Sequence, residues 1–371
     1  MTTTADIAII GGGIAGLSLA AAVGSRARVV VLEAEPRLYH HTSSRSAEQM
    51  QPTYGPAPVR RLTSASIPRV QAIAERLGRP IFTPRPLLWV STTGDRSHLD
   101  ELLATVAGLE ELDAAEAVRL LPALRPDAVH AAGIDRSAVE VDVPALLEAY
   151  RSTAVDAGAV VLPSARVDGA VRTGDAWRLT AGAAAVEAPV VVNAAGAWVE
   201  RVAALFGARS RRLQPLRRTV AVGVPAGRPV DPAWPMVADA LDTFYFRPRG
   251  TGILASALED EPSEPEDARP RAEVVATVLE RVNAVTDLDL REAATTWTGL
   301  RTLAPDAVPV VGRDGAVPGF YWLAGQGGYG IQTSAALGAV VADDLLGTPS
   351  AIPGLEGVLA DLSPARPAVQ G

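Results

Sequence analysis

A glycine-rich segment near the start of the chain has the residue types and spacing that bind a dinucleotide. It reads Gly-Gly-Gly-Ile-Ala-Gly from Gly11 and directly follows a short apolar run. In a strand–turn–helix unit, Gly11 would make the tight turn, Gly13 would let the backbone approach a pyrophosphate, and Gly16 would let the helix pack on the strand. Glu33 ends the next apolar run, where a carboxylate can bind ribose hydroxyls. The combination predicts a dinucleotide site.

The far end of the chain favours FAD over NAD as that dinucleotide. The segments 193–198 (Asn-Ala-Ala-Gly-Ala-Trp) and 325–330 (Gly-Gln-Gly-Gly-Tyr-Gly) follow apolar runs, and the second opens a long helix of small residues. A helix N-terminus with exposed backbone N–H groups suits the electron-rich pyrimidine end of a flavin. A close-packing turn is the structural alternative for these glycines, and an NAD(P)-dependent dehydrogenase is the functional one.

The composition of the 371 residues excludes several other chemistries. The chain has no Cys, and all 34 basic residues are Arg, so thiol nucleophiles, iron–sulfur clusters, Schiff-base lysines and a Cys-linked flavin are absent. Its four His show no metal-ligand spacing, and no metal is expected. The net charge of −8 argues against binding to nucleic acid or anionic lipid.

The hydrophobic pattern predicts an α/β protein without a membrane span. Apolar strands around the first glycine segment form a βαβ unit, and glycines interrupt the apolar stretch 7–23, so we expect a cytoplasmic protein. Helices are expected over 56–77, broken or kinked at Pro68, and over 98–121. Residues 259–271 are acidic and proline-rich and are interpreted as a surface loop.

Five motifs, in order over most of residues 1–345, resemble the D-amino acid oxidase/dehydrogenase group of FAD flavoproteins, and within it bacterial D-arginine dehydrogenase most closely. They are the first glycine segment, 41–47 (His-Thr-Ser-Ser-Arg-Ser-Ala), 193–198, 297–301 (Trp-Thr-Gly-Leu-Arg) and 326–334. The resemblance implies noncovalent FAD and a Rossmann-like FAD-binding domain with an inserted α+β substrate domain on a mixed sheet. The expected FAD-binding segments are 1–50, 138–206 and 302–347, the substrate-binding segments are 51–137 and 207–301, and 348–371 is a tail.

The resemblance also assigns roles to single residues. Arg301 would pair with the substrate carboxylate, which its planar fork suits, and Arg218 and the Tyr245 hydroxyl would assist it. Tyr54 would be a mobile lid residue. For Arg218 the alternative is a solvated basic patch with its arginine neighbours, and for Tyr245 a half-buried sheet tyrosine. Gly328 and Gln332 would face the ligand. The residues assigned to the cofactor are Gly11, Gly13, Gly16, Glu33, Ser44, Arg45, Ser46, Val167, Ala195, Gly196, Gly325, Gly327, Gly328, Gly330 and Ile331.

Two departures from the resemblance concern the substrate pocket. Leu87 stands where the arginine-specific enzyme has a Glu that receives the basic side chain, and Gln49 stands where it has a His. A buried guanidinium would have no counter-charge beside Leu87, so an apolar side arm is expected. Covalent flavin could involve only His40 or His41, and without the Lys that sarcosine oxidases use for oxygen, oxidase activity is in doubt.

The predicted function is FAD-dependent oxidative deamination of a D-amino acid or an N-substituted glycine with an apolar side arm. Hydride would pass from Cα to flavin N5, and the resulting imine would hydrolyse to a 2-oxo acid. The electron acceptor stays open among oxygen, a quinone and a protein. The alternatives are a glycine/sarcosine-type amine oxidase and a non-catalytic flavoprotein subunit.

Overall fold

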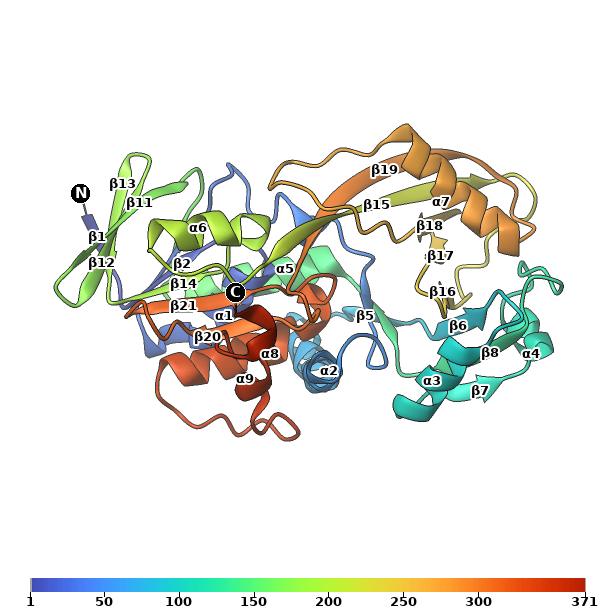
Figure 1. The fold of residues 1–371 in the computed structure, drawn as a ribbon, viewed down its shortest axis with the longest axis horizontal. Coiled ribbons are helices and arrows are strands. Elements are labelled where there is room, and N and C mark those ends of the chain that lie inside the picture. Colours follow the sequence, from blue (N-terminus) through green and yellow to red (C-terminus); the bar gives the residue numbers. More distant parts are fainter. Residues whose placement is uncertain (1, 371) are drawn as a thin grey trace.

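The computed structural model describes residues 2–370 and contains two large sheets side by side (Figure 1). The first has six strands, all parallel except the last pair. Its short apolar strands are almost wholly buried on both faces, as expected for a parallel sheet covered on both sides. In spatial order they are β10 (Val160–Leu162), β3 (Val29–Leu32), β2 (Ile7–Ile10), β14 (Val190–Asn193), β21 (Phe320–Ala324) and β20 (Val310–Arg313).

Alternate residues of this sheet enter two different cores. Ile7 and Ile9 pack against helices on one face, whereas Ala8 and Ile10 pack on the opposite face. The helices of the first core are α1 (Ile14–Val23), α2 (Ala57–Leu77), α5 (Val143–Asp156) and α8 (Gly330–Leu345). The second core is closed by α6 (Val199–Leu205) and by a small sheet of β1 (Thr2–Thr4), β13 (Ala184–Ala188), β12 (Ala176–Ala181) and β11 (Val167–Thr173).

The second large sheet has eight strands and is mixed, because β16 and β6 are parallel and its other neighbours are antiparallel. In spatial order it contains β19 (Leu290–Leu303), β15 (Gln214–Pro225), β18 (Gly252–Ser256), β17 (Tyr245–Arg249), β16 (Met236–Asp239), β6 (Leu87–Ser91), β8 (Ala131–Asp135) and β7 (Glu110–Leu112). Helices α4 (Ala114–Leu120) and α7 (Ala272–Val285) cover one face, and α3 (Ser97–Thr105) packs at the other. The predicted α/β class with a mixed second sheet is confirmed.

Two connections join the sheets. The long strands β15 and β19 extend from the eight-stranded sheet toward the six-stranded one (Figure 1). A three-stranded sheet of β4 (Gln49–Met50), β9 (Val139–Val141) and β5 (Phe82–Pro84) lies where the chain crosses between them. Side chains from both large sheets therefore meet in one region.

Several elements differ from their expected form. The helix expected over 98–121 is α3, β7 and α4, because Gly108 has a φ of +87° and β7 pairs with β8. Helix α2 continues through Pro68 without a break and packs on α8. The expected tail is anchored: it includes α9 (Val358–Asp361), and Leu355 and Leu362 enter the core of the six-stranded sheet. Within residues 2–370, no helix is both long and apolar enough to span a bilayer.

Candidate active site

One cavity joins the glycine-rich loop of the six-stranded sheet to the arginines of the eight-stranded sheet. Gly11 and Gly13 line one part of it, and Arg301 and Tyr245 line another. All of the predicted site residues line this cavity except three, which are Gly16, Ser44 and Leu87. The tertiary structure therefore brings together residues that are more than 300 positions apart in the sequence, such as Gly11 and Gln332.

The glycine loop has the close backbone contacts that its sequence predicts. Gly11 has a φ of +114°, and a Cβ there would lie 2.3 Å from the carbonyl oxygen of Ala194. A Cβ on Gly16 would lie 2.0 Å from the carbonyl oxygen of Gly11, so Gly16 allows α1 to pack on β2 and does not face the cavity. A side chain at Gly11 would displace the backbone that follows β14, and one at Gly16 would displace the glycine loop itself.

A serine beside the predicted one contacts this loop. The Oγ of Ser43 accepts a hydrogen bond of 2.9 Å from the backbone N–H of Ile14, at the N-terminus of α1, and it lines the cavity. Ser44 points elsewhere, because its Oγ donates to the carbonyl oxygen of His41 at 3.1 Å. The two serines are adjacent, and only the tertiary structure distinguishes them.

Glu33 is fixed at the end of β3 beside the glycine loop. Its Oε2 accepts a hydrogen bond of 2.7 Å from the N–H of Gly12, and its Oε1 accepts one of 2.8 Å from the N–H of Glu35. The carboxylate lines the cavity, at the place where the fingerprint predicts a contact with ribose hydroxyls.

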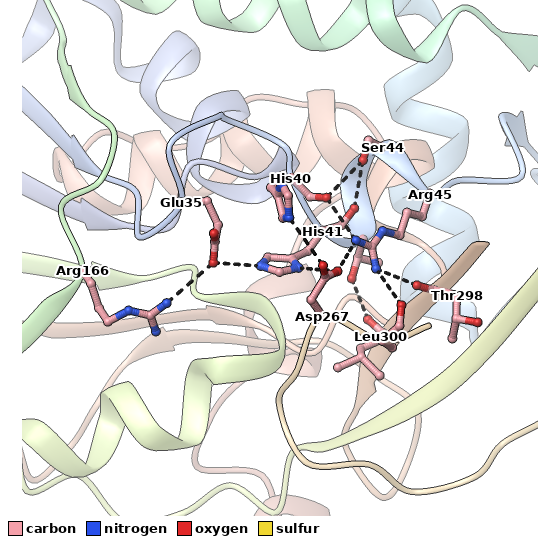
Figure 2. Close-up of polar contacts among 11 residues, drawn as sticks. Glu35, His40, His41, Ser44, Arg45, Arg166, Asp267, Thr298 and Leu300 are labelled. Atoms are coloured by element: carbon pink, nitrogen blue, oxygen red, sulfur yellow. Dashed lines mark hydrogen bonds and ion pairs between the residues drawn. The ribbon is translucent and has the colours of Figure 1, made fainter. Parts of the chain in front are cut away.

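A polar cluster forms the wall next to this region, and Figure 2 shows that it gathers around Asp267. Arg45 forms an ion pair with Asp267, and it also donates to the carbonyl oxygen of Thr298 at 2.7 Å. Nε2 of His40 and Nδ1 of His41 each lie 3.8 Å from an oxygen of Asp267. Asp267 belongs to the acidic loop 259–271. Its ion pair with Arg45 therefore links this loop to the segment that follows β3.

The same cluster contains three potential metal ligands. Ligand atoms of Glu35, His40 and His41 lie within 4.8 Å of one another, a grouping that the spacing of the His residues does not reveal. Burial lowers the pKa of His41, which keeps its ring neutral near pH 7. Arg166 lies 3.6 Å from Glu35, and Arg45 pairs with the neighbouring aspartate, so cations of the chain already balance these carboxylates. We therefore assign the cluster to the cavity wall.

Two arginines with unused donors define the other part of the cavity. Leu216 of β15 pairs with Arg301 of β19, and Arg218 pairs with Gly299, so the two arginine side chains share one face of the sheet. Within residues 2–370 the guanidinium of Arg301 has no hydrogen-bond or ion-pair partner. Arg218 pairs through Nη2 with Asp260, but its Nε and Nη1 are buried without a partner.

The neighbours of Arg218 do not form a solvated patch. Arg211 and Arg217 are each 7% exposed. Arg211 forms an ion pair with Asp314 at 2.8 Å, and Arg217 forms one with Glu266 at 2.6 Å. Burial, followed by repulsion from Arg301, lowers the pKa of Arg218, although a guanidinium stays charged at any physiological pH. The buried donors of Arg218 without partners, beside the cationic Arg301, favour an anion in the cavity.

Tyrosines surround these arginines. Tyr245 is 5% exposed, and its hydroxyl has no partner among the described residues. The ring of Tyr54 lies 5.6 Å from that of Tyr329 and 6.2 Å from that of Trp89, measured between centroids. Burial raises the pKa of Tyr54 and Tyr329, so both hydroxyls stay protonated and can donate. Neither Trp89 nor Tyr329 is among the sequence-predicted site residues.

The last glycine segment contacts the same arginine. A Cβ on Gly328 would lie 2.9 Å from Cζ of Arg301, so the backbone of this segment packs directly on the guanidinium. Gln332 lines the cavity, and its Nε2 donates to the carbonyl oxygen of Tyr54 at 3.5 Å, the outer limit for a hydrogen bond.

The structure does not bring Leu87 into the cavity. Leu87 and Trp89 share one face of β6, but Leu87 is fully buried behind the wall, whereas Trp89 lines it. Both side chains point to the same side of β6, but the cavity reaches only as far along the strand as Trp89. The alternation of side chains in the sequence does not reveal where along a strand a cavity ends. The apolar part of the wall is formed by Trp89, Val220, Met236, Ala238 and Leu258.

The chain matches the FAD dependent oxidoreductase family (DAO) over residues 6–344 and therefore belongs to this family. It is 26% identical over 360 residues to glycine oxidase of Geobacillus kaustophilus, which covers 92% of this chain and 93% of that enzyme. It is also 26% identical over 257 residues to hydrogen cyanide synthase subunit HcnC of Pseudomonas aeruginosa, covering 67% of this chain and 59% of that subunit.

Solved structures share this fold over nearly their whole length. Glycine oxidase from G. kaustophilus has a TM-score of 0.85 at 24% identity, covering 98% of this chain and 99% of that one. Iminodiacetate oxidase (IdaA) from Chelativorans sp. BNC1 has a TM-score of 0.81 at 21% identity, covering 96% and 98%. The predicted oxidoreductase class and the FAD cofactor are confirmed, whereas these similarities do not distinguish D-arginine dehydrogenase within the group.

The residues of the cavity fit FAD. Gly13 keeps the approach to the N-terminus of α1 free of a side chain, and Glu33 stands at the end of the neighbouring strand. Further along the cavity, Thr302 Oγ1 and Gln326 Nε2 are buried without partners, as expected for groups that a ligand satisfies. The cavity continues from these groups to Arg301.

Proposed function

We propose that this protein catalyses the FAD-dependent oxidative deamination of an amino acid, either a D-amino acid or an N-substituted glycine, with an apolar side arm. The observation that carries the proposal is the unpartnered guanidinium of Arg301, buried in the cavity that also contains the glycine loop. A buried arginine with free donors, flanked by tyrosine hydroxyls, binds a carboxylate in a fixed orientation. Glycine oxidase, among the relatives, acts on the simplest such amino acid.

The side arm is proposed from the apolar residues that share this face of the eight-stranded sheet with the arginines. Trp89, Met236 and Leu258 give this part of the wall an apolar surface. Asp242, the acid that lines this end of the cavity, interacts with Arg218 and Arg301, whose charges already balance it. An apolar arm gains about 25 cal/mol for each Å² removed from water, whereas a cationic arm would lose its hydration without a partner. Leu87 does not contribute to this preference for an apolar side arm, because it lies behind the cavity wall.

In the mechanism, the chain's own residues position the substrate. Arg301 holds the carboxylate bidentately, while Arg218 and Tyr245 supply the donors that now lack partners. Tyr54 lines this end of the cavity with the ring of Tyr329 packed against it, and the two rings help to exclude water. When bound, FAD would supply the two-electron oxidation at Cα. Water would hydrolyse the imine product to a 2-oxo acid, with release of ammonia or a primary amine.

We also propose that FAD is held noncovalently. The chain has no Cys, Nε2 of His41 lies 3.3 Å from Glu35, and Nε2 of His40 lies 3.8 Å from Asp267. Acid precipitation should therefore release all of the flavin into the supernatant. Flavin that stays with the pellet would contradict this assignment.

The test of the proposed function is anaerobic reduction of the purified holoprotein. D-amino acids, glycine, N-methylglycine and longer N-alkylglycines are mixed with the protein, and the loss of flavin absorbance near 450 nm is followed (roughly the oxidised-flavin band). We expect reduction by members with an apolar arm, and production of ammonia or a primary amine with the 2-oxo acid. No reduction by any of them would favour the alternative of a non-catalytic flavoprotein subunit.

A further inference from the structure

The side-chain amide of Gln49 is a buried polar group of the cavity that the proposed mechanism leaves without a role. Gln49 is 7% exposed and lines the cavity. Both its Oε1 and its Nε2 lack a hydrogen-bond partner among residues 2–370. A buried amide without hydrogen bonds at either end lowers the stability of the folded protein. We therefore expect a bound ligand to form hydrogen bonds with this amide.

The surrounding structure fixes the position of Gln49. Glu48, the preceding residue, has a φ of +61°, and its carboxylate pairs with the fully buried Arg247. Arg247 also donates from Nε to the carbonyl oxygen of Ala47 at 2.9 Å, and its Nη1 lies 3.1 Å from Glu140. Glu140 is in turn the β9 residue that pairs with Gln49. The backbone that carries this side chain is therefore held in place by a buried ion-pair network.

Gln49 differs from its neighbours because it can accept a hydrogen bond. The other unsatisfied groups at the substrate end are the guanidiniums of Arg218 and Arg301, the indole N–H of Trp89 and the hydroxyl of Tyr245, which act as donors toward a carboxylate. Oε1 of Gln49 is an uncharged acceptor in this group. It can therefore receive the N–H of a substrate whose carboxylate occupies the donors.

The nearby alternatives for accepting an amine are less suitable. The amide of Gln51 is held by a contact of its Nε2 with Sδ of Met236 at 3.1 Å, whereas neither end of the Gln49 amide has a partner among the described residues. Asp242 lines the cavity from the exposed turn between β16 and β17, and it interacts with the charges of Arg218 and Arg301. A carboxylate would also stabilise the ammonium form, which cannot lose hydride from Cα as readily as the neutral amine, and an amide oxygen favours that form less than a carboxylate does.

We propose that Oε1 of Gln49 accepts a hydrogen bond from the amino group of the substrate, and that it thereby selects primary and secondary amines over tertiary ones. A neutral tertiary amine has no N–H and would leave the amide unsatisfied. The inference rests on the proposed function, because it assumes that the substrate is an amino acid bound through Arg301.

The experiment compares N-methylglycine with N,N-dimethylglycine in the holoprotein, the Gln49→Met variant and the Gln71→Met variant. Gln71 is exposed on α2, outside the cavity, and serves as the matched control. We expect kcat/KM for N-methylglycine to exceed that for N,N-dimethylglycine by about tenfold or more in the wild type and the control. In Gln49→Met this ratio should fall to about twofold, because kcat/KM decreases for N-methylglycine and stays unchanged for N,N-dimethylglycine. Binding of propionate, which has a carboxylate but no amine, should be the same in all three proteins.

Three results would overturn the inference. The wild type could oxidise the tertiary amine as well as the secondary one, Gln49→Met could keep the wild-type preference, or it could lose propionate binding as well, which would assign Gln49 a general structural role. A wild type that oxidises neither amine nor any other amino acid contradicts the proposed function itself, and the inference with it.

A second variant keeps the test available if Gln49→Met fails to fold. Gln49→Glu places a carboxylate at the same position, which stabilises the ammonium and raises the pKa of the bound amine. The acidic limb of the kcat–pH profile should then move upward by about one unit or more relative to the wild type. An unchanged profile would contradict contact between Gln49 and the amine.

Discussion

At the scale of single residues, the contact between Gly328 and Arg301 joins the cofactor and substrate ends of the cavity. The glycine belongs to the segment that opens α8, and its backbone packs on the guanidinium that we propose binds the carboxylate. This contact requires a glycine for steric reasons, because a Cβ would lie 2.9 Å from Cζ of Arg301. Two predictions follow from the arrangement at this scale.

Arg301→Met should raise the KM of the best substrate by roughly two orders of magnitude, because a desolvated carboxylate would lose its charged partner. The FAD content should stay stoichiometric, since the arginine belongs to the substrate part of the cavity. Steady-state kinetics and the absorbance ratio of the purified variant measure both effects. Arg291→Met, at an exposed position of the same strand, is the control, and equal KM values in the two variants would remove Arg301 from the site.

Gly328→Ala should raise KM by roughly tenfold with little loss of stability, because the added Cβ displaces the end of a flexible side chain and not the backbone. Gly94→Ala is the control, since a Cβ at that position would meet open space. Thermal unfolding and steady-state kinetics are the measurements. A large loss of thermal stability without a change in KM would show that the contact is structural only.

At the scale of elements, the acidic loop 259–271 connects the eight-stranded sheet to the cofactor region through ion pairs. Its ion pairs reach Arg218 through Asp260, Arg217 through Glu266 and Arg45 through Asp267. The last of these crosses to the segment that follows β3 and lines the cavity (Figure 2). The loop thus connects elements that carry both parts of the site.

Asp267→Asn should speed the dissociation of FAD, because Arg45, His40 and His41 would lose their shared carboxylate beside the cofactor part of the cavity. The hydrogen bond from Arg45 lowers the pKa of Asp267, so the carboxylate stays ionised even below its ordinary titration range and is charged at neutral pH. Dilution of the holoprotein, with recovery of flavin fluorescence, gives the rate. Glu261→Gln, which affects an exposed pair within the loop, should behave like the wild type, and equal rates for both variants would contradict the prediction.

At the scale of the whole molecule, the cofactor region lies where the two sheets meet, so FAD binding should be linked to the stability of the fold. A ligand that binds only the folded state stabilises it by about 2.7 kcal/mol at one hundred times its Kd. The Tm of the apoprotein should therefore rise steadily with FAD concentration in a thermal scan.

Gly13→Asp is the control for this effect. Its side chain would meet Ser43, since even a Cβ would lie 3.1 Å from that Oγ, and its charge would repel the pyrophosphate at the N-terminus of α1. The Tm of this variant should not respond to FAD. A response equal to that of the wild type would mean that the glycine loop is not the phosphate site.

The sequence by itself determined the βαβ unit and the glycine loop with Glu33, which indicate a dinucleotide, because these depend on contacts within about thirty residues that strand and helix periodicity already restrict. The choice of FAD came from segments farther along the chain and from the family resemblance, which also made Arg301 and Arg218 candidate site residues. The helix expected over 98–121 failed because a strand pairing that involves β7 outweighed local helical propensity.

Only the tertiary structure decided which of two adjacent or alternate residues reaches the cavity. Ser43 lines it and Ser44 does not, and Trp89 lines it while Leu87 lies behind the wall, although each pair has the same local signals. The pairing of Arg218 with Asp260 and the unsatisfied amide of Gln49 are likewise products of long-range packing. The physical reason is that periodicity fixes the direction of a side chain relative to its own strand or helix, whereas the position of the cavity depends on how the two sheets pack together.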